Sequence, residues 1–127
     1  MKNAALASLF AFALALLFVT PLIAHHSMSM YDLDHVITLR GTIAGFEWSN
    51  PHAQIRFDRQ DDQGSLEKWT AECPSPGRLS RSGWTTETLK PGDQVTLIGN
   101  QAKDGSNLMR LDRIVLPDGH ELRGYLR

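Results

Sequence analysis

Histidine and methionine side chains gather where the polar part of the chain begins. His25 and His26 directly follow a long apolar stretch, and Met28 and Met30 come next. Imidazole and amine nitrogens suit Cu(II), whereas thioether sulfurs suit Cu(I). A chain that begins at His25 would chelate one ion between its α-amino group and its imidazole. The sequence therefore predicts a copper site here, with ligands for both oxidation states.

His52 is a further candidate ligand. It ends the motif Trp48-Ser49-Asn50-Pro51-His52, which we expect to form the corner between the first two strands. If the amino terminus folds over this corner, His52 adds a nitrogen to the copper site. The alternative is a turn histidine that is hydrogen-bonded to the backbone. Because each nitrogen must lose its proton to bind metal, we expect copper affinity to fall below about pH 6.

The apolar stretch before the histidines is typical of a secretory signal peptide. Lys2 is followed by apolar residues from Ala4 to Val19, then by the helix breaker Pro21 and by the small residue Ala24. We expect cleavage after Ala24, which would place the mature protein in the periplasm or outside the cell. The alternative is an uncleaved membrane anchor, because the stretch is just long enough to span a bilayer.

Composition limits the classes of partner. The 127 residues carry a formal net charge of −1, and Lys2 is the only charged residue before Asp32. The polar part is therefore slightly acidic, which argues against a nucleic-acid partner and against binding to an anionic membrane after signal cleavage. The single cysteine, Cys73, excludes an internal disulfide and a multi-cysteine metal cluster. We expect a signal peptide at 1–24, a flexible His- and Met-containing terminus at 25–35 and one domain at 36–127.

From Tyr31 onward, apolar residues alternate with a period of two, and turn residues divide the pattern into short segments. Gly41 and Gly45 predict bulges in a long, bent first strand. A short helix is expected from Ser75-Pro76 to Gly83. The predicted fold is an all-β, Greek-key OB-like barrel of five to six antiparallel strands, with the helix between the third and fourth. The alternative is an open sheet or small sandwich. Strands are expected at 36–48, 53–58, 66–73, 94–99 and 108–116, with a short one ending near 123.

The helix and the residues after it are expected to stabilise the barrel. We expect Trp84 to be buried and Arg81 to pair with a carboxylate such as Glu72 or with carbonyls at a strand end. Cys73 is expected to face the core from the third strand. The residues assigned to this structural role are Pro76, Leu79, Arg81, Gly83 and Trp84.

Two tryptophans suggest an alternative function. Trp48 and Trp69 lie on the first and third predicted strands, and barrels of this type often bind ligands on one face. In this alternative, an aromatic face takes a small apolar or sugar ligand, or a partner protein, and no metal is needed. Core packing is the other role open to these side chains.

An enzyme is not expected. The sequence has no nucleophile elbow, no glycine-rich phosphate loop after a strand and no HExxH motif. Thiol catalysis would require His52 or His120 beside Cys73. The acidic pair Asp61-Asp62 lies in a turn. We therefore expect a binding protein.

The order of motifs resembles the small secreted proteins of the DUF6152 family. The resemblance covers essentially the whole mature chain, and it implies no activity, cofactor or partner, because that family is defined by sequence alone. The chain departs from the family pattern at Met28, where an aromatic residue is usual, and at Cys73, so the resemblance implies no thiol chemistry. The matching motifs are His25-His26-Ser27, Leu39-x-Gly41-Thr42, Phe46-x-Trp48-x-Asn50-Pro51-His52, Ser75-Pro76-x-x-Leu79-x-Arg81-x-Gly83-Trp84 and Leu89-Lys90-Pro91-Gly92-Asp93.

Overall fold

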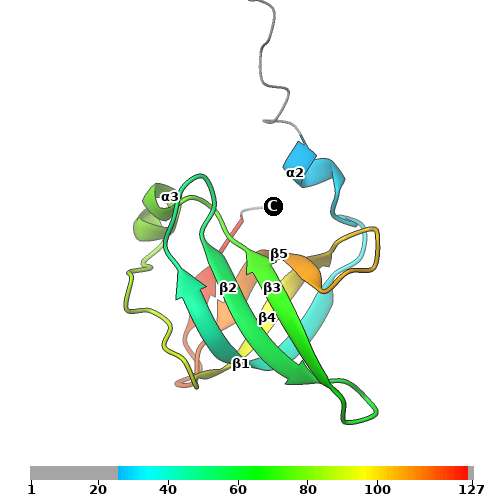
Figure 1. Ribbon diagram of the computed structural model, residues 1–127. Coiled ribbons are helices and arrows are strands. Elements are labelled where there is room, and N and C mark those ends of the chain that lie inside the picture. The colour runs from blue at the N-terminus through cyan, green and yellow to red at the C-terminus, as the bar shows by residue number, and fades with distance from the viewer. Residues whose placement is uncertain (1–25, 126–127) are drawn as a thin grey trace, which may run out of the picture.

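The computed structural model describes residues 26–125, which form a barrel of strongly bent strands with a short helix beside it (Figure 1). Along this part of the chain, neither helix has the length and apolar character needed to cross a membrane. The elements are α2 (His26–Ser29), β1 (Ile37–Glu47), β2 (Gln54–Gln60), β3 (Leu66–Glu72), α3 (Pro76–Arg81), β4 (Gln94–Gln101), β5 (Leu108–Val115) and β6 (Glu121–Arg123).

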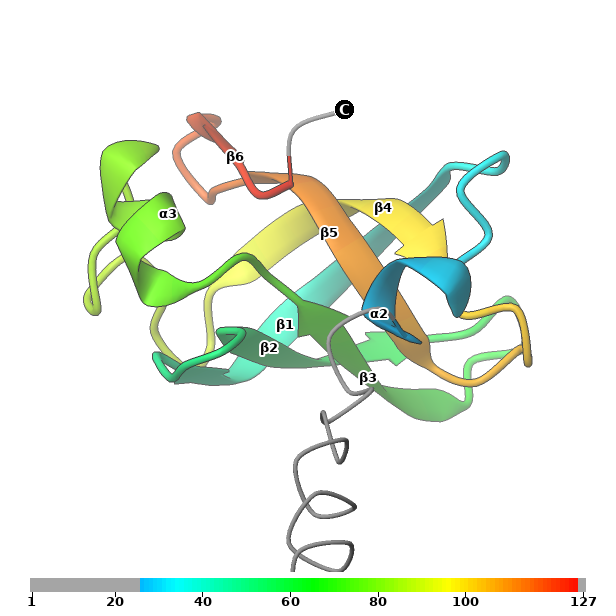
Figure 2. The same cartoon turned by 90° about the horizontal axis from the view of Figure 1, so that it is seen from above.

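The strands form one sheet in the order β3-β2-β1-β4-β5-β6. A further pairing joins β3 to β5 and closes the first five strands into a barrel, with β6 added on the outside (Figure 2). The OB-like barrel is thereby confirmed, and the open sheet is excluded. The prediction of antiparallel strands throughout needs one correction, because β3 and β5 pair in parallel from Thr70↔Leu108 to Glu72↔Arg110. In a closed ring of five strands, four antiparallel pairs leave the fifth pair parallel.

The first strand is long because its two halves serve different neighbours. Residues 37–42 pair with β4, and residues 42–47 pair with β2. The predicted bulge is found between Ile43 and Gly45. Gly41 has another role, since a Cβ there would lie 2.5 Å from the Phe57 ring and 2.9 Å from the Asp58 carbonyl oxygen. Glycine at this position therefore lets β2 approach β1 closely.

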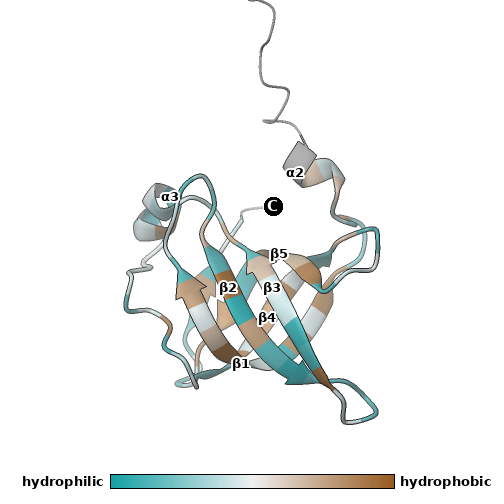
Figure 3. Cartoon of the chain, in the orientation of Figure 1, coloured by the Kyte–Doolittle hydropathy of each residue, from teal (hydrophilic) through white to brown (hydrophobic). Residues whose placement is uncertain are grey.

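Alternation along the strands separates the core from the surface. Figure 3 shows this as hydrophobic and hydrophilic bands that succeed one another along β1, β2 and β3. Leu39, Ile55, Leu97 and Leu111 are among the buried residues that fill the interior.

As expected, Leu79 of α3 and Trp84, which follows the helix, are fully buried in this core. Pro76 stands in the first turn of α3, and Gly83 follows the helix with a φ of 87°, a value that favours glycine. The expected pairing of Arg81 with Glu72 is wrong. Arg81 is exposed and its side chain makes no hydrogen bond or ion pair within residues 26–125, while Glu72 is bonded to other side chains.

The segment before β1 is attached to the barrel over much of its length. Tyr31 is buried and forms a bridge with Ala102. The amide of Lys103 donates to the Met30 carbonyl oxygen at 2.8 Å, and the Asn100 side chain donates to the carbonyls of Asp32 and His35. Of the terminus expected to be flexible, residues 30–35 are therefore held against β4 and the turn that follows it. His25 lies outside the described residues.

Cys73 has the expected place in the core. It is fully buried, and burial together with the neighbouring Glu72 charge raises the pKa of its thiol. Because thiol reagents attack the thiolate, we expect slow labelling of the native protein and fast labelling in denaturant, measured by absorbance with a chromogenic disulfide. Equal rates in both states would contradict a buried thiol.

Candidate functional site

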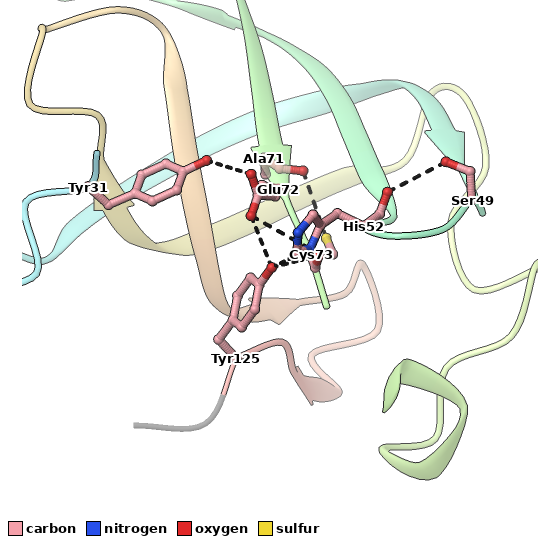
Figure 4. A network of polar contacts seen from close by, with 7 residues as sticks. All are labelled: Tyr31, Ser49, His52, Ala71, Glu72, Cys73 and Tyr125. Atoms are coloured by element: carbon pink, nitrogen blue, oxygen red, sulfur yellow. Dashed lines mark hydrogen bonds and ion pairs between the residues drawn. The ribbon is translucent and has the colours of Figure 1, made fainter. Parts of the chain in front are cut away.

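A cluster of polar side chains lies at one end of the barrel, around the carboxylate of Glu72 (Figure 4). Glu72 is the last residue of β3, and its side chain is largely buried. Tyr31 donates its phenol proton to Oε2 at 3.0 Å. The phenol oxygen of Tyr125 lies 3.0 Å from Oε1 and also 3.0 Å from the carbonyl oxygen of Cys73. One carboxylate thus binds a residue that precedes β1 and a residue that follows β6.

His52 reaches the same carboxylate from the corner between β1 and β2. It follows the cis peptide Asn50-Pro51. Its Nδ1 lies 2.9 Å from the Tyr125 phenol oxygen and 3.7 Å from Glu72 Oε1. Its Nε2 makes no hydrogen bond to any residue between 26 and 125, and 35% of the side chain is exposed. The ring is therefore held by side chains through Nδ1, whereas Nε2 has no partner and is not among the buried polar atoms that lack one in the described chain.

Backbone hydrogen bonds and a contact with the Arg110 guanidinium fix the position of Tyr125. The amides of Gly124 and Tyr125 donate to the Asp112 and Leu111 carbonyls at 2.7 and 2.9 Å, which carries the chain along β5 after β6 ends. A Cβ at Gly124 would collide with the Leu111 carbonyl oxygen, so this approach needs glycine. The Arg110 guanidinium lies 4.0 Å from the centre of the Tyr125 ring, a cation–π contact.

Arg110 is itself buried opposite Glu72, at the parallel pairing of β3 with β5. Its Nη1 donates to Asp112 Oδ1 at 2.9 Å, and its Nε has no partner within the described chain. Figure 4 shows the two phenols approaching the Glu72 carboxylate from different directions, with His52 beside Tyr125. The site is therefore built from β3, from the β1–β2 corner and from both ends of the described chain.

Both phenols keep their protons strongly. Burial, and then the charge of Glu72 and the hydrogen bond to it, raise the pKa of Tyr31 and of Tyr125 above the usual value. A phenol whose pKa is higher in the folded state stabilises the fold below its unfolded pKa of about 10, and this contribution is lost as pH rises through the folded pKa.

An alkaline titration should therefore reveal both tyrosines together, since the protein has no others. We expect the folded protein to show no tyrosinate absorbance at about pH 10 to 11, where free phenols ionise. The absorbance should appear only with the loss of the circular dichroism signal at higher pH. Ionisation near pH ~10 without unfolding would contradict buried, carboxylate-bound phenols.

The other predicted metal ligands lie close to the cluster in sequence. Met28 and Met30 are 58% and 41% exposed, and Met30 directly precedes Tyr31. His26 begins α2. Between residues 26 and 125, no three His, Cys, Asp or Glu side chains are arranged to hold a metal ion. Of the predicted ligands, the described side chains therefore bring only His52 into the cluster.

Two further histidines lie elsewhere on the surface. His35 places Nδ1 2.8 Å from Asp32 Oδ2, and this contact holds the pKa of the Asp32 carboxyl below its usual value. His120 is exposed in the turn between β5 and β6. Neither ring contacts the Glu72 cluster, which makes His120 a suitable control for metal binding.

The two tryptophans of the alternative function pack into or against the core, Trp69 as a buried member of it and Trp48 as a partly buried neighbour. Trp69 is only 5% exposed, stacks on Phe57 at a centroid distance of 6.2 Å and donates from Nε1 to Glu67. Trp48 packs edge-on against Phe46 at 5.6 Å. A surface groove of about 690 Å³ is lined by polar residues such as Arg40, Thr42, Asp58, Gln60 and Gln94 and by neither tryptophan. Trp69 thus offers a ligand little surface.

No sequence motif marks Tyr31, Glu72 or Tyr125 as parts of the site. The sequence suggests Glu72 only as a partner for Arg81. One feature of the sequence does point to the cluster, because the only two tyrosines of the chain lie close to the two ends of the predicted barrel. Their meeting at one carboxylate depends on the pairing of β3 with β5, which alternation alone does not reveal.

A family model described as "Family of unknown function (DUF6152)" matches residues 14–109. The matched range contains the histidine motif that ends at His52, and it contains Glu72. It ends before Arg110 and Tyr125. No curated protein matches the chain.

Proposed function

The chain belongs to DUF6152, a family of unknown function, and we propose that it binds copper in the periplasm or outside the cell. In this proposal, cleavage after Ala24 frees the amino group of His25. That amine and the His25 imidazole form a chelate ring, to which His26 or His52 adds a nitrogen. Met28 or Met30 takes over as a ligand when copper is reduced.

The proposal is supported by one observation: Tyr31 and His52 both lie against the carboxylate of Glu72. Tyr31 binds one carboxylate oxygen, and His52 lies beside the other. His25 precedes Tyr31 by six residues, and four of the residues between them form α2, in which the chain rises only about 1.5 Å per residue. The proposed chelate is therefore tethered close to Tyr31, whose phenol binds the carboxylate that His52 also approaches.

Binding, with no catalytic step, is the activity proposed. The one thiol of the chain is fully buried and holds its proton, which argues against a thiol nucleophile. The slightly acidic composition argues against a nucleic-acid partner. The ligand is a metal ion, and a small molecule or a periplasmic protein is the alternative partner.

A titration with Cu(II) tests the proposal. We expect the protein that begins at His25 to bind copper at least about tenfold more tightly than a form with extra residues before His25, because the extension destroys the chelate ring. His52→Ala should also weaken binding, whereas His120→Ala should leave it unchanged. Affinity should fall below about pH 6, where the nitrogens are protonated.

Equal affinities for the processed and the extended protein would contradict a site at the terminus. That result would favour the alternative, in which a face near Trp48 and Trp69 takes a small apolar or sugar ligand or a partner protein. Mass spectrometry of the mature protein, as secreted by its host, establishes which residue is the first. A mature form that retains Ala24 or any residue before it would contradict the proposed cleavage.

A further inference from the structure

We infer that Tyr125 and Glu72 hold His52 in the tautomer that carries its ring proton on Nδ1, so that the lone pair of Nε2 faces solvent. The inference about the tautomer stands on the hydrogen bonds of the cluster alone. Its consequence for metal binding rests on the proposed function. In that setting, Tyr125 and Glu72 are positioning residues for a ligand of a divalent metal ion, and His52 is the ligand itself.

Counting protons at Tyr125 leads to this tautomer. The phenol has one proton, and three atoms lie within hydrogen-bond distance of its oxygen: His52 Nδ1 at 2.9 Å, Glu72 Oε1 at 3.0 Å and the Cys73 carbonyl oxygen at 3.0 Å. The carboxylate and the carbonyl can only accept. If Nδ1 were also an acceptor, three acceptors would compete for a single proton.

The opposite tautomer resolves this conflict. A protonated Nδ1 donates to the Tyr125 oxygen, and Tyr125 then donates its own proton to Glu72 or to the Cys73 carbonyl. Two protons now serve the three contacts instead of one, and only Glu72 Oε1 and the Cys73 carbonyl share the phenol proton. The arrangement also removes a repulsion, because a bare Nδ1 would direct its lone pair toward Glu72 Oε1 at 3.7 Å.

The residues around His52, Tyr125 and Glu72 hold these three side chains in place. Tyr31 donates to Oε2 of Glu72, which fixes the other side of the carboxylate. Arg110 lies against the ring of Tyr125 and places a positive charge next to the phenol. His52 donates to Tyr125 and Tyr125 donates to Glu72, so the three residues form a chain of hydrogen bonds, the relay, from the part-exposed ring to the end of β3.

This pattern has a known use in metal sites. A histidine that binds a metal through one nitrogen usually donates the proton of its other nitrogen to a carboxylate or another acceptor, which fixes the ring and raises its basicity. Here the carboxylate acts through a phenol. The exposed nitrogen, Nε2, is the one left for the metal, and it has no partner within residues 26–125.

The tautomer can be measured in the wild-type protein without any metal. We expect nitrogen-15 NMR of the metal-free protein at about pH 8, above the ordinary histidine pKa, to show a protonated Nδ1 and an unprotonated Nε2 for His52. His52→Gln identifies the signals. An unprotonated Nδ1 in the wild-type protein would overturn the inference, whether or not copper binds.

Matched tyrosine variants test the relay. Tyr125→Phe removes the phenol that contacts His52 and keeps the ring beside Arg110, so we expect the ring proton to move to Nε2 in a large share of molecules. Tyr31→Phe removes a phenol from the same carboxylate without touching His52, so the tautomer should remain as in the wild type. A shift of the same size in both variants would contradict a relay through Tyr125.

Copper affinity then separates the two proposals. Tyr125→Phe should weaken Cu(II) binding about tenfold or more, as the loss of a residue that orients a ligand usually does. If the wild-type protein binds no copper, the proposed function fails, while the NMR result still decides the tautomer. If copper binds and Tyr125→Phe changes the tautomer but not the affinity, the positioning role is overturned and the proposed function stands.

Discussion

Trp84→Ala will lower the free energy of unfolding by about 3 to 5 kcal/mol, the usual cost of removing a large aromatic side chain from a core. Trp84 is 1% exposed and packs against Phe46 at a centroid distance of 5.9 Å. Its Nε1 donates to the Arg123 carbonyl oxygen at 2.8 Å. The side chain therefore joins the segment after α3 both to the core and to β6, and urea denaturation measures its contribution.

A second variant separates packing from the hydrogen bond. Trp84→Phe keeps most of the ring but lacks the N–H group, so we expect a smaller loss of about 1 to 2 kcal/mol. A loss below about 1 kcal/mol for Trp84→Ala would contradict a core role, because buried aromatic truncations cost more than that. It would make Trp84 a candidate for contact with a ligand.

Gly99→Ala is expected to lower the free energy of unfolding by about 3 kcal/mol or more, at or above the upper end of the range for overpacking. Gly99 lies in β4 where the register with β5 shifts. A Cβ there would collide with the carbonyl oxygen of Arg110 and lie 3.0 Å from the carbonyl carbon. Both are backbone atoms, so β4 and β5 would have to separate, and urea denaturation reports the cost.

Gly77→Ala is the matched control for Gly99→Ala. Gly77 lies in α3, and a Cβ there would meet no atom within 4 Å. Alanine is the better residue in a helix, so we expect no loss and up to about 1 kcal/mol of gain. Similar losses for the two variants would show that the close approach at Gly99 does not limit stability.

Much of the fold could be predicted because local rules determine it. Alternation in segments such as Ala53 to Asp58 identifies strands, and Ser75-Pro76 identifies the start of a helix. Alternation does not say which strands become neighbours. The parallel pairing of residues 70–72 with β5 arises only when the ring of five strands closes. Alternation within single strands therefore does not predict it.

The site was predicted only in part for a related reason. His52 could be assigned to the β1–β2 corner because Asn50-Pro51 is a strong turn signal. Tyr31, Glu72 and Tyr125 are far apart in sequence and meet only through the closed barrel. The pairing of Arg81 with Glu72 was wrong because the phenols already bind both carboxylate oxygens, while Arg81 in the last turn of α3 faces solvent.

The shared carboxylate also has a topological consequence. Because Tyr31 and Tyr125 bind the two oxygens of Glu72, the two ends of the folded domain lie side by side. A short linker could join them, and new ends could open in the exposed β2–β3 hairpin at Asp61 to Gly64, as circular permutation requires. The barrel would keep every strand pair while its chain began at β3 and ended at β2.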